Sequence, residues 1–145
     1  MILQSVSAKD VEIVRRSIEA FAWGDVDALL AASSPDVEWT MAADEPNPGT
    51  YRGHDGLRRL ASDISEPWTD RLKGTMEFEA FIDRGDWVVV PWTARVHGRI
   101  SGIPMELSET YAVRVEDGRI VRVHEYRTKA EAMEAVGLRR EPPAP

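Results

Sequence analysis

The chain has 145 residues, with 18 Lys and Arg against 25 Asp and Glu, so its formal net charge is -7. This length predicts a single domain that can bury a core and still leave room for a pocket. There is no Cys, which excludes a disulfide framework, a thiolate nucleophile and a thiolate metal site. The acidic balance, with no stripe of basic and aromatic residues, argues against nucleic acid as a partner.

Membrane and cofactor signals are also missing from the sequence. No apolar run approaches the ~20 residues that span a bilayer, and the first residues lack the basic region of a signal peptide. We therefore expect a cytoplasmic protein with no membrane partner. The three His residues show no ligand pattern such as His-x-x-x-His, and glycine motifs for nucleotides are absent. We expect neither a metal nor a cofactor.

The first half of the chain predicts helices around one short strand. Apolar residues at helical spacing follow a capping box at residues 7–10 and stop at Gly24. Asp25 is placed to cap a second helix, which ends before Pro35. Residues 36–41 alternate as a half-buried strand does. A loop with Pro46 and Pro48 follows, and then a third helix capped by Asp55.

In the second half the hydrophobic period changes to two. We expect strands over residues 76–82, 87–97, 105–115 and 119–127, joined in pairs by tight turns at 84–86 and 116–118. A short helix ending near Gly137 follows. Residues 1–138 are expected to form one domain, and the proline-rich tail 139–145 to be disordered.

This order predicts an α+β domain in which helices lie across one face of a curved antiparallel sheet. An eleven-residue strand over 87–97 reaches roughly 36 Å at ~3.3 Å per residue, and sheets that long bend. A bent sheet closed by helices leaves a cone-shaped cavity between the two layers.

Three motifs in this order carry a family resemblance: Tyr-Arg-Gly-His-Asp-Gly-Leu at 51–57, Gly-Ile-Pro at 102–104 and Glu-Asp-Gly-Arg-Ile at 116–120. With the order of elements over residues 8–138, they resemble the SnoaL-like branch of the nuclear transport factor 2-like superfamily. Relatives there include ketosteroid isomerases, limonene epoxide hydrolases, polyketide cyclases and non-catalytic binding modules. The fold alone does not choose among these activities.

The resemblance implies positions for site residues. Against ketosteroid isomerases, Met41 falls at the catalytic base, Ser17 at the Tyr and Tyr111 at the oxyanion Asp. A thioether cannot take a proton, which disfavours steroid isomerisation by that mechanism. Against epoxide hydrolases, Arg95 matches the Arg, His97 the first Asp and Glu125 the second, while Trp39 and Met41 replace the residues that hold the water. His97 also matches the His before Gly-Ile-Pro in SnoaL-like cyclases.

Arg95, His97 and Glu125 are therefore the predicted catalytic group, with Tyr111 as a hydrogen-bond donor to a carbonyl oxygen. A His held by a carboxylate and flanked by Arg can take and return a proton near neutral pH. The resemblance implies that Arg95 and His97 face the cavity. Periodicity favours the opposite assignment, in which the alternate apolar row is core: Val88, Val90, Trp92, Ala94 and Val96.

Further residues are expected to line the cavity for a flat, largely apolar ligand: Trp39, Met41, Phe21, Met76, Glu109 and Ser17. Pockets are mostly apolar with few polar groups. The alternative is that the apolar members are simply core, and that Tyr111 packs with its hydroxyl on the backbone.

Two functions follow. The first is a cofactor-independent acid/base enzyme, of the cyclase, isomerase or epoxide hydrolase type, acting on a small apolar carbonyl compound or epoxide. The second is a non-catalytic small-molecule-binding or scaffold module. Both predict a homodimer formed through the sheet, because the apolar row of 88–96 would otherwise be an exposed strip.

Overall fold

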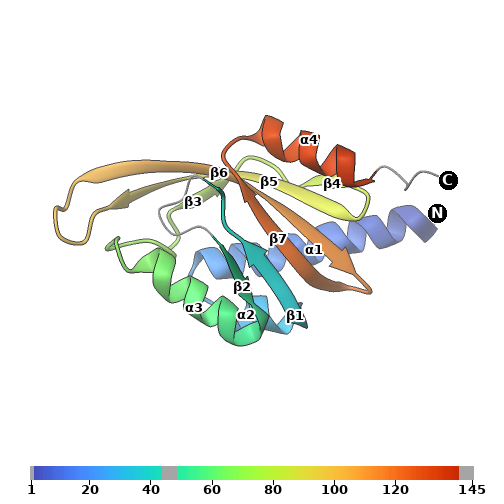
Figure 1. The fold of residues 1–145 in the computed structure, drawn as a ribbon, viewed down its shortest axis with the longest axis horizontal. Coiled ribbons are helices and arrows are strands. Elements are labelled where there is room, and N and C mark those ends of the chain that lie inside the picture. The colour runs from blue at the N-terminus through green and yellow to red at the C-terminus, as the bar shows by residue number, and fades with distance from the viewer. Residues whose placement is uncertain (1, 44–48, 141–145) are drawn as a thin grey trace.

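The computed structural model describes residues 2–43 and 49–140. In chain order, its helices and strands are α1 (Ile2–Ala22), α2 (Val26–Ala31), β1 (Ser33–Thr40), β2 (Thr50–Arg52), α3 (Gly53–Ser65), β3 (Met76–Phe78), β4 (Ile82–Arg84), β5 (Trp87–His97), β6 (Pro104–Glu116), β7 (Arg119–Tyr126) and α4 (Lys129–Arg140) (Figure 1). The expected proline loop at 44–48 lies outside the described residues. The expected tail begins inside α4, and its last part, 141–145, also lies outside them.

The strands form one curved sheet that does not close into a barrel (Figure 1). Their order is β2-β1-β7-β6-β5-β3, and β4 also pairs with β5. The predicted α+β class is confirmed. The sheet is mixed rather than purely antiparallel, because β1 runs parallel to β7. The longest strand pair of the sheet is the hairpin β5–β6, which is in register from Trp87 opposite Arg114 to His97 opposite Pro104.

The sheet has two faces with different covers. Helices α1, α2 and α3 lie over the face that we call inner, and α4 lies over the opposite, outer face (Figure 1). The main core fills the inner side and is built from buried side chains of both layers, including Val14, Ile18, Phe21, Leu57, Leu60, Trp39, Tyr111 and Val113. A smaller core joins α4 to the outer face, with Trp87, Val89, Ala112, Ala132 and Val136.

The apolar row of β5 belongs to the inner face. All five of its side chains are buried in the main core: Val88, Val90, Trp92, Ala94 and Val96. The assignment from periodicity is therefore the correct one. The row is covered by this chain's own helices, so the exposed strip from which a homodimer was predicted does not exist.

Several local predictions can be compared with the backbone. Asp25 caps α2 as expected, with its Oδ1 accepting a 3.0 Å hydrogen bond from Ala28 N. Asp117 and Gly118 turn between β6 and β7 with φ of 51° and 75°, the positive values that a tight hairpin turn requires. The predicted caps at 7–10 and at Asp55 are wrong. Helix α1 already begins at Ile2, and α3 begins at Gly53 without a side-chain cap.

The predicted strand over 76–82 is divided into β3 and β4. The pairing with β5 slips by one residue between Phe78, opposite Trp92, and Ile82, opposite Val89. The slip lies at Pro91, which has no N–H to donate to a ladder. The chain stays attached there through a 2.9 Å hydrogen bond from Glu79 N to the Pro91 carbonyl.

Within the part of the chain that the structure describes, no helix is both long and apolar enough to cross a membrane.

Candidate functional site

A cavity of about 500 Å³ lies on the inner side of the sheet, between the strands and the end of α3. One part of its wall is apolar and comes from five segments of the chain: Met41, Ile64, Pro67, Trp68, Trp92 and Leu107. The polar part consists of Tyr51, Asp63, Arg71, Glu106, Ser108, Glu109 and Glu125. A volume of this size accommodates a small organic molecule.

Glu125 is the most deeply placed carboxyl of this wall. Its residue is 7% exposed, and its Oε2 accepts a 2.7 Å hydrogen bond from the indole Nε1 of Trp39. Strand β7 presents Glu125 to the inner face next to Tyr111, its register partner on β6. Because Trp39 is fully buried, the indole fixes the orientation of the carboxyl.

Trp39 itself is part of an aromatic row under the cavity and does not line it. Its ring lies 5.6 Å from that of Phe21 and 5.1 Å from that of Tyr111, centroid to centroid. Tyr111 continues the row to Trp92 at 5.5 Å. Such tilted and edge-on contacts are favourable aromatic geometries. The row makes a stiff floor, and only Trp92 of these four reaches the cavity wall.

Tyr111 is fully buried, and its hydroxyl has no hydrogen-bond partner among the described residues. The alternative in which this hydroxyl reaches the backbone is therefore not what the structure has. Burial raises the pKa of Tyr111 well above its usual range, and the positive charge of Arg71 only partly opposes that rise. The phenol stays neutral, so it is available as a donor and not as a base.

Arg71 is a site residue that the sequence did not suggest. It lies in the irregular segment between α3 and β3, and only 6% of it is exposed. Its guanidinium carbon is 4.9 Å from the centroid of the Trp92 ring, a cation–π contact. Its Nη1 has no hydrogen-bond partner within residues 2–43 and 49–140.

A second hydrogen-bonded pair closes the side of the cavity beneath α3. The Tyr51 hydroxyl donates a 2.6 Å hydrogen bond to Oδ2 of Asp63. Burial, followed by this bond to a carboxylate, raises the pKa of Tyr51 to about 12. Tyr51 lies on β2 and Asp63 on the last turn of α3, so the bond ties the helix to the sheet edge.

Arg95 and His97 do not line the cavity, contrary to what the resemblance implied. Both alternate with the buried row of β5 and are exposed on the outer face. Neither is near Glu125, because the sheet separates them. The structure therefore does not bring the predicted catalytic group together.

His97 has a different setting, in which it holds the segment after α3. Its Nδ1 lies 2.9 Å from Oδ2 of Asp70, and its backbone N–H donates a 2.7 Å bond to Oδ1 of the same carboxylate. Arg99 binds the same segment through carbonyl oxygens of Ser65, Glu66 and Trp68, at 3.3, 2.7 and 2.9 Å. These bonds attach the segment after α3 to the end of β5 and the loop that follows it. The same segment places Trp68 and Arg71 in the cavity wall.

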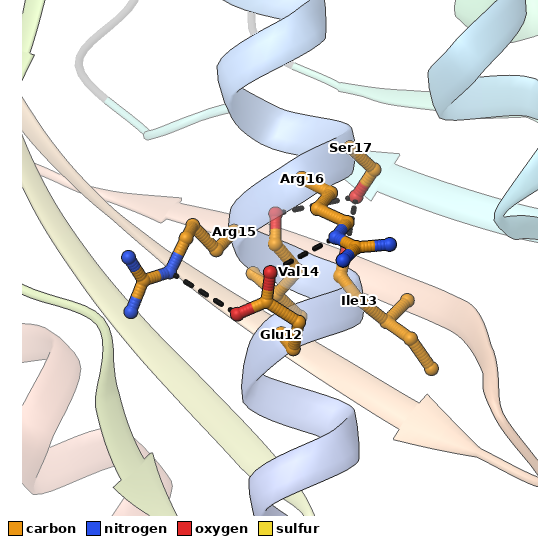
Figure 2. A network of polar contacts seen from close by, with 6 residues as sticks. All are labelled: Glu12, Ile13, Val14, Arg15, Arg16 and Ser17. Atoms are coloured by element: carbon orange, nitrogen blue, oxygen red, sulfur yellow. Dashed lines mark hydrogen bonds and ion pairs between the residues drawn. The ribbon is translucent and has the colours of Figure 1, made fainter.

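The other predicted ligand contacts divide between cavity and core. Met41 and Glu109 line the cavity. Phe21 and Met76 are buried in the main core, which is the alternative given above for the apolar residues. Ser17 is taken up by its own helix, since its hydroxyl donates 2.7 Å to the Ile13 carbonyl. Figure 2 shows this hydroxyl turned back along α1, beside the surface ion pairs of Glu12 with Arg15 and Arg16.

No group of three His, Asp or Glu side chains with metal-binding geometry occurs among the residues that the structure describes. The wall has instead one buried cation, a buried carboxyl and an apolar surface. This set can hold a flat molecule by its body and bind an oxygen of that molecule.

A family model described as a SnoaL-like domain matches residues 14–123. The chain belongs to the SnoaL-like domain family. An uncharacterised protein of Mycobacterium tuberculosis H37Rv is 28% identical over 126 residues, which cover 87% of this chain and 94% of the relative. A crystal structure of an NTF2-like protein from Burkholderia thailandensis is 29% identical, with a TM-score of 0.73, and covers 86% of this chain and 96% of that one.

A further solved structure of this fold is described as a putative SnoaL-like polyketide cyclase from Jannaschia sp. CCS1. It is 17% identical, with a TM-score of 0.65, over 93% of this chain and 94% of the other. At this distance the likeness establishes the fold. For a SnoaL-like chain, function must therefore be argued from its own cavity.

Proposed function

We propose that this SnoaL-like protein binds a small, largely apolar carbonyl compound or epoxide in its cavity and converts it by cofactor-independent acid/base chemistry. The observation that carries the proposal is the position of the Glu125 carboxyl in the cavity wall. A carboxyl fixed by Trp39 at 2.7 Å, in the wall of a mostly apolar cavity, is placed to exchange a proton with a bound molecule.

Other groups of the wall support this role. Arg71 can stabilise negative charge that develops on a substrate oxygen, and it acts strongly because it is removed from water. Trp92, Ile64 and Leu107 offer apolar surface for the body of the substrate. In this proposal Glu125 exchanges the proton with the substrate, a role that the sequence analysis assigned to His97.

Binding is tested first, by thermal shift of the wild type with polycyclic ketones, terpene epoxides, steroids and quinones. A ligand at ~100 times its dissociation constant adds about 2.7 kcal/mol to the free energy of unfolding, which moves the melting temperature by several degrees. Leu107→Trp and Ile64→Phe fill the cavity and are expected to abolish the shift. Ile103→Trp is the matched control and should keep the shift, because Ile103 lies in the loop between β5 and β6 and is 60% exposed.

Turnover is tested next with Glu125→Gln, whose amide oxygen can still accept the bond from Trp39. We expect this variant to bind the hit compound with unchanged affinity and to convert it at least ~100-fold more slowly than the wild type. A compound that binds inside the cavity and is never converted by the wild type would contradict the enzyme. It would favour the second function, a non-catalytic binding module, which the enclosed position of Tyr111 behind the cavity wall also favours.

A further inference from the structure

Three hydrogen-bond donors beside the cavity are buried and have no acceptor among the described residues. They are Nη1 of Arg71, Nε1 of Trp92 and the hydroxyl of Tyr111. The three side chains are neighbours: the guanidinium carbon lies 4.9 Å from the Trp92 ring, and the Trp92 and Tyr111 rings are 5.5 Å apart. Buried polar atoms of native proteins nearly always have partners, so a cluster of three orphans requires an explanation.

Guanidinium and indole N–H groups can only donate, and the Tyr111 oxygen is the one atom of the cluster that can accept. A single hydroxyl oxygen cannot satisfy all the N–H groups that Arg71 and Trp92 present beside it. The cluster also carries a full positive charge, because an arginine does not lose its proton in a protein. What it lacks is an acceptor with negative charge.

The carboxylates of the cavity wall do not supply that acceptor. Asp63 accepts from Tyr51 at 2.6 Å, and Glu125 accepts from Trp39 at 2.7 Å. None of the carboxylates in the described part of the chain accepts a hydrogen bond from Nη1 of Arg71. Buried charges in folded proteins are normally paired, so a buried guanidinium with an unbonded Nη1 in a cavity wall is suited to a charged ligand.

We propose that the ligand of this cavity is a small aromatic or hydrophobic acid whose oxyanion, a carboxylate or an ionised phenol or enol, binds to Arg71. This rests on the proposed function, since it names the charge class of the molecule that the same cavity binds. The planar guanidinium fork matches a carboxylate in two parallel hydrogen bonds. Trp92 supplies a flat apolar surface directly below that fork.

The test compares acids with their uncharged amides, which have nearly the same shape. Benzoate, 2-naphthoate and biphenyl-4-carboxylate are titrated calorimetrically against the wild type, each beside its carboxamide. We expect the acid of the pair that fits to bind at least tenfold more tightly than its amide, and the difference to shrink as salt is added.

Variants then assign the preference to Arg71. Arg71→Met is expected to bind the amide as the wild type does and to lose the preference for the acid, while Arg71→Lys keeps part of it. The matched control is Arg95→Met, which removes an exposed arginine on the other face of the sheet and is expected to change nothing. Unchanged amide binding shows that each variant is folded.

The outcomes separate the two proposals. If amides bind the wild type as tightly as acids, water satisfies the three donors and the charge preference is overturned, while a small-molecule cavity stands. If Arg71→Met retains the preference for acids, the assignment to Arg71 is overturned. If neither member of any pair binds, and the neutral ketones and epoxides also fail, the proposed function fails and this inference fails with it.

Discussion

The indole of Trp39 donates a 2.7 Å hydrogen bond to the Glu125 carboxylate across 86 positions of sequence, joining β1 to its parallel neighbour β7. It orients the one carboxyl that lies deep in the cavity wall. It also holds together the only parallel strand pair of the described sheet.

Replacing Trp39 with Phe is expected to lower the free energy of unfolding by about 2 kcal/mol. The change leaves the buried Glu125 oxygen without its donor, and hydrogen bonds to charged groups contribute about 1.5 to 3 kcal/mol. Urea unfolding measures the loss. Trp23→Phe is the matched control, since Trp23 is 73% exposed, and it should cost much less. Equal losses in the two variants would contradict a stabilising role for the Trp39 bond.

The Asp70–His97 contact predicts that the stability of the fold falls in acid. The side-chain and backbone hydrogen bonds from His97 lower the pKa of Asp70 below its ordinary value of 3.8. A carboxyl whose folded-state pKa is lowered stabilises the fold fully above 3.8, and this contribution disappears as the pH falls through the folded-state value. Asp70→Asn should therefore be less stable than the wild type at neutral pH, and the gap should close in acid.

Chemical unfolding from pH 6 down to pH 2 follows that gap. The exposed Asp55, which pairs with Arg58 of its own helix, provides the control Asp55→Asn. If wild-type and Asp70→Asn curves stay parallel over the whole range, the pair does not contribute in the way described.

Tyr51 predicts a loss of stability at alkaline pH. Its pKa is raised to about 12 from an ordinary value of 10.0, mainly by burial and then by its bond to Asp63. The folded state keeps this proton longer than the unfolded chain does, so stability falls as the pH rises between these two values. Tyr51→Phe removes the group and is expected to fall less steeply from pH 10 to 12. A slope identical to that of the wild type would show that Tyr51 titrates normally.

Two helical glycines are expected to respond to alanine with opposite signs. A Cβ on Gly137 of α4 meets nothing within 4 Å, so Gly137→Ala should stabilise by up to ~1 kcal/mol through helix propensity. A Cβ on Gly56 of α3 would lie 3.0 Å from the carbonyl carbon of Tyr51. Gly56→Ala should lose that gain or destabilise, because α3 must move off β2. Melting temperatures compare the two, and an equal rise in both would contradict the close contact at Gly56.

Strand β5 shows how much of the fold could be predicted from the sequence. Its bounds, Trp87 and His97, follow from the alternation of apolar residues, and so does the burial of the row from Val88 to Val96. The resemblance led to the opposite face, and a shift of one residue in a strand is enough to turn every side chain to the other side. Periodicity within this chain was the better guide to Arg95.

Arg71 shows what the sequence could not reveal. It lies in a stretch with neither helical nor strand period, and a single Arg there looks like a solvated charge. Its burial arises only when Trp92, 21 positions later in the numbering, lies beneath it on the folded sheet. Glu125 was foreseeable because it continues an inward row of β7, whereas its bond to Trp39 depends on a parallel pairing that local pattern does not predict.

Arg99 gives the loop between β5 and β6 a part in setting the dimensions of the binding chamber. Its guanidinium reaches three carbonyl oxygens at and just beyond the C-terminal end of α3, and its backbone N–H donates to the Pro67 carbonyl at 2.9 Å. Helix α3 is thus tethered at one end to the loop 98–103 of this hairpin, which does not itself line the chamber. A longer or shorter hairpin would tilt the helix and resize the chamber while leaving its wall chemistry intact. Related chains could therefore exchange one ligand for a larger one by altering this loop alone.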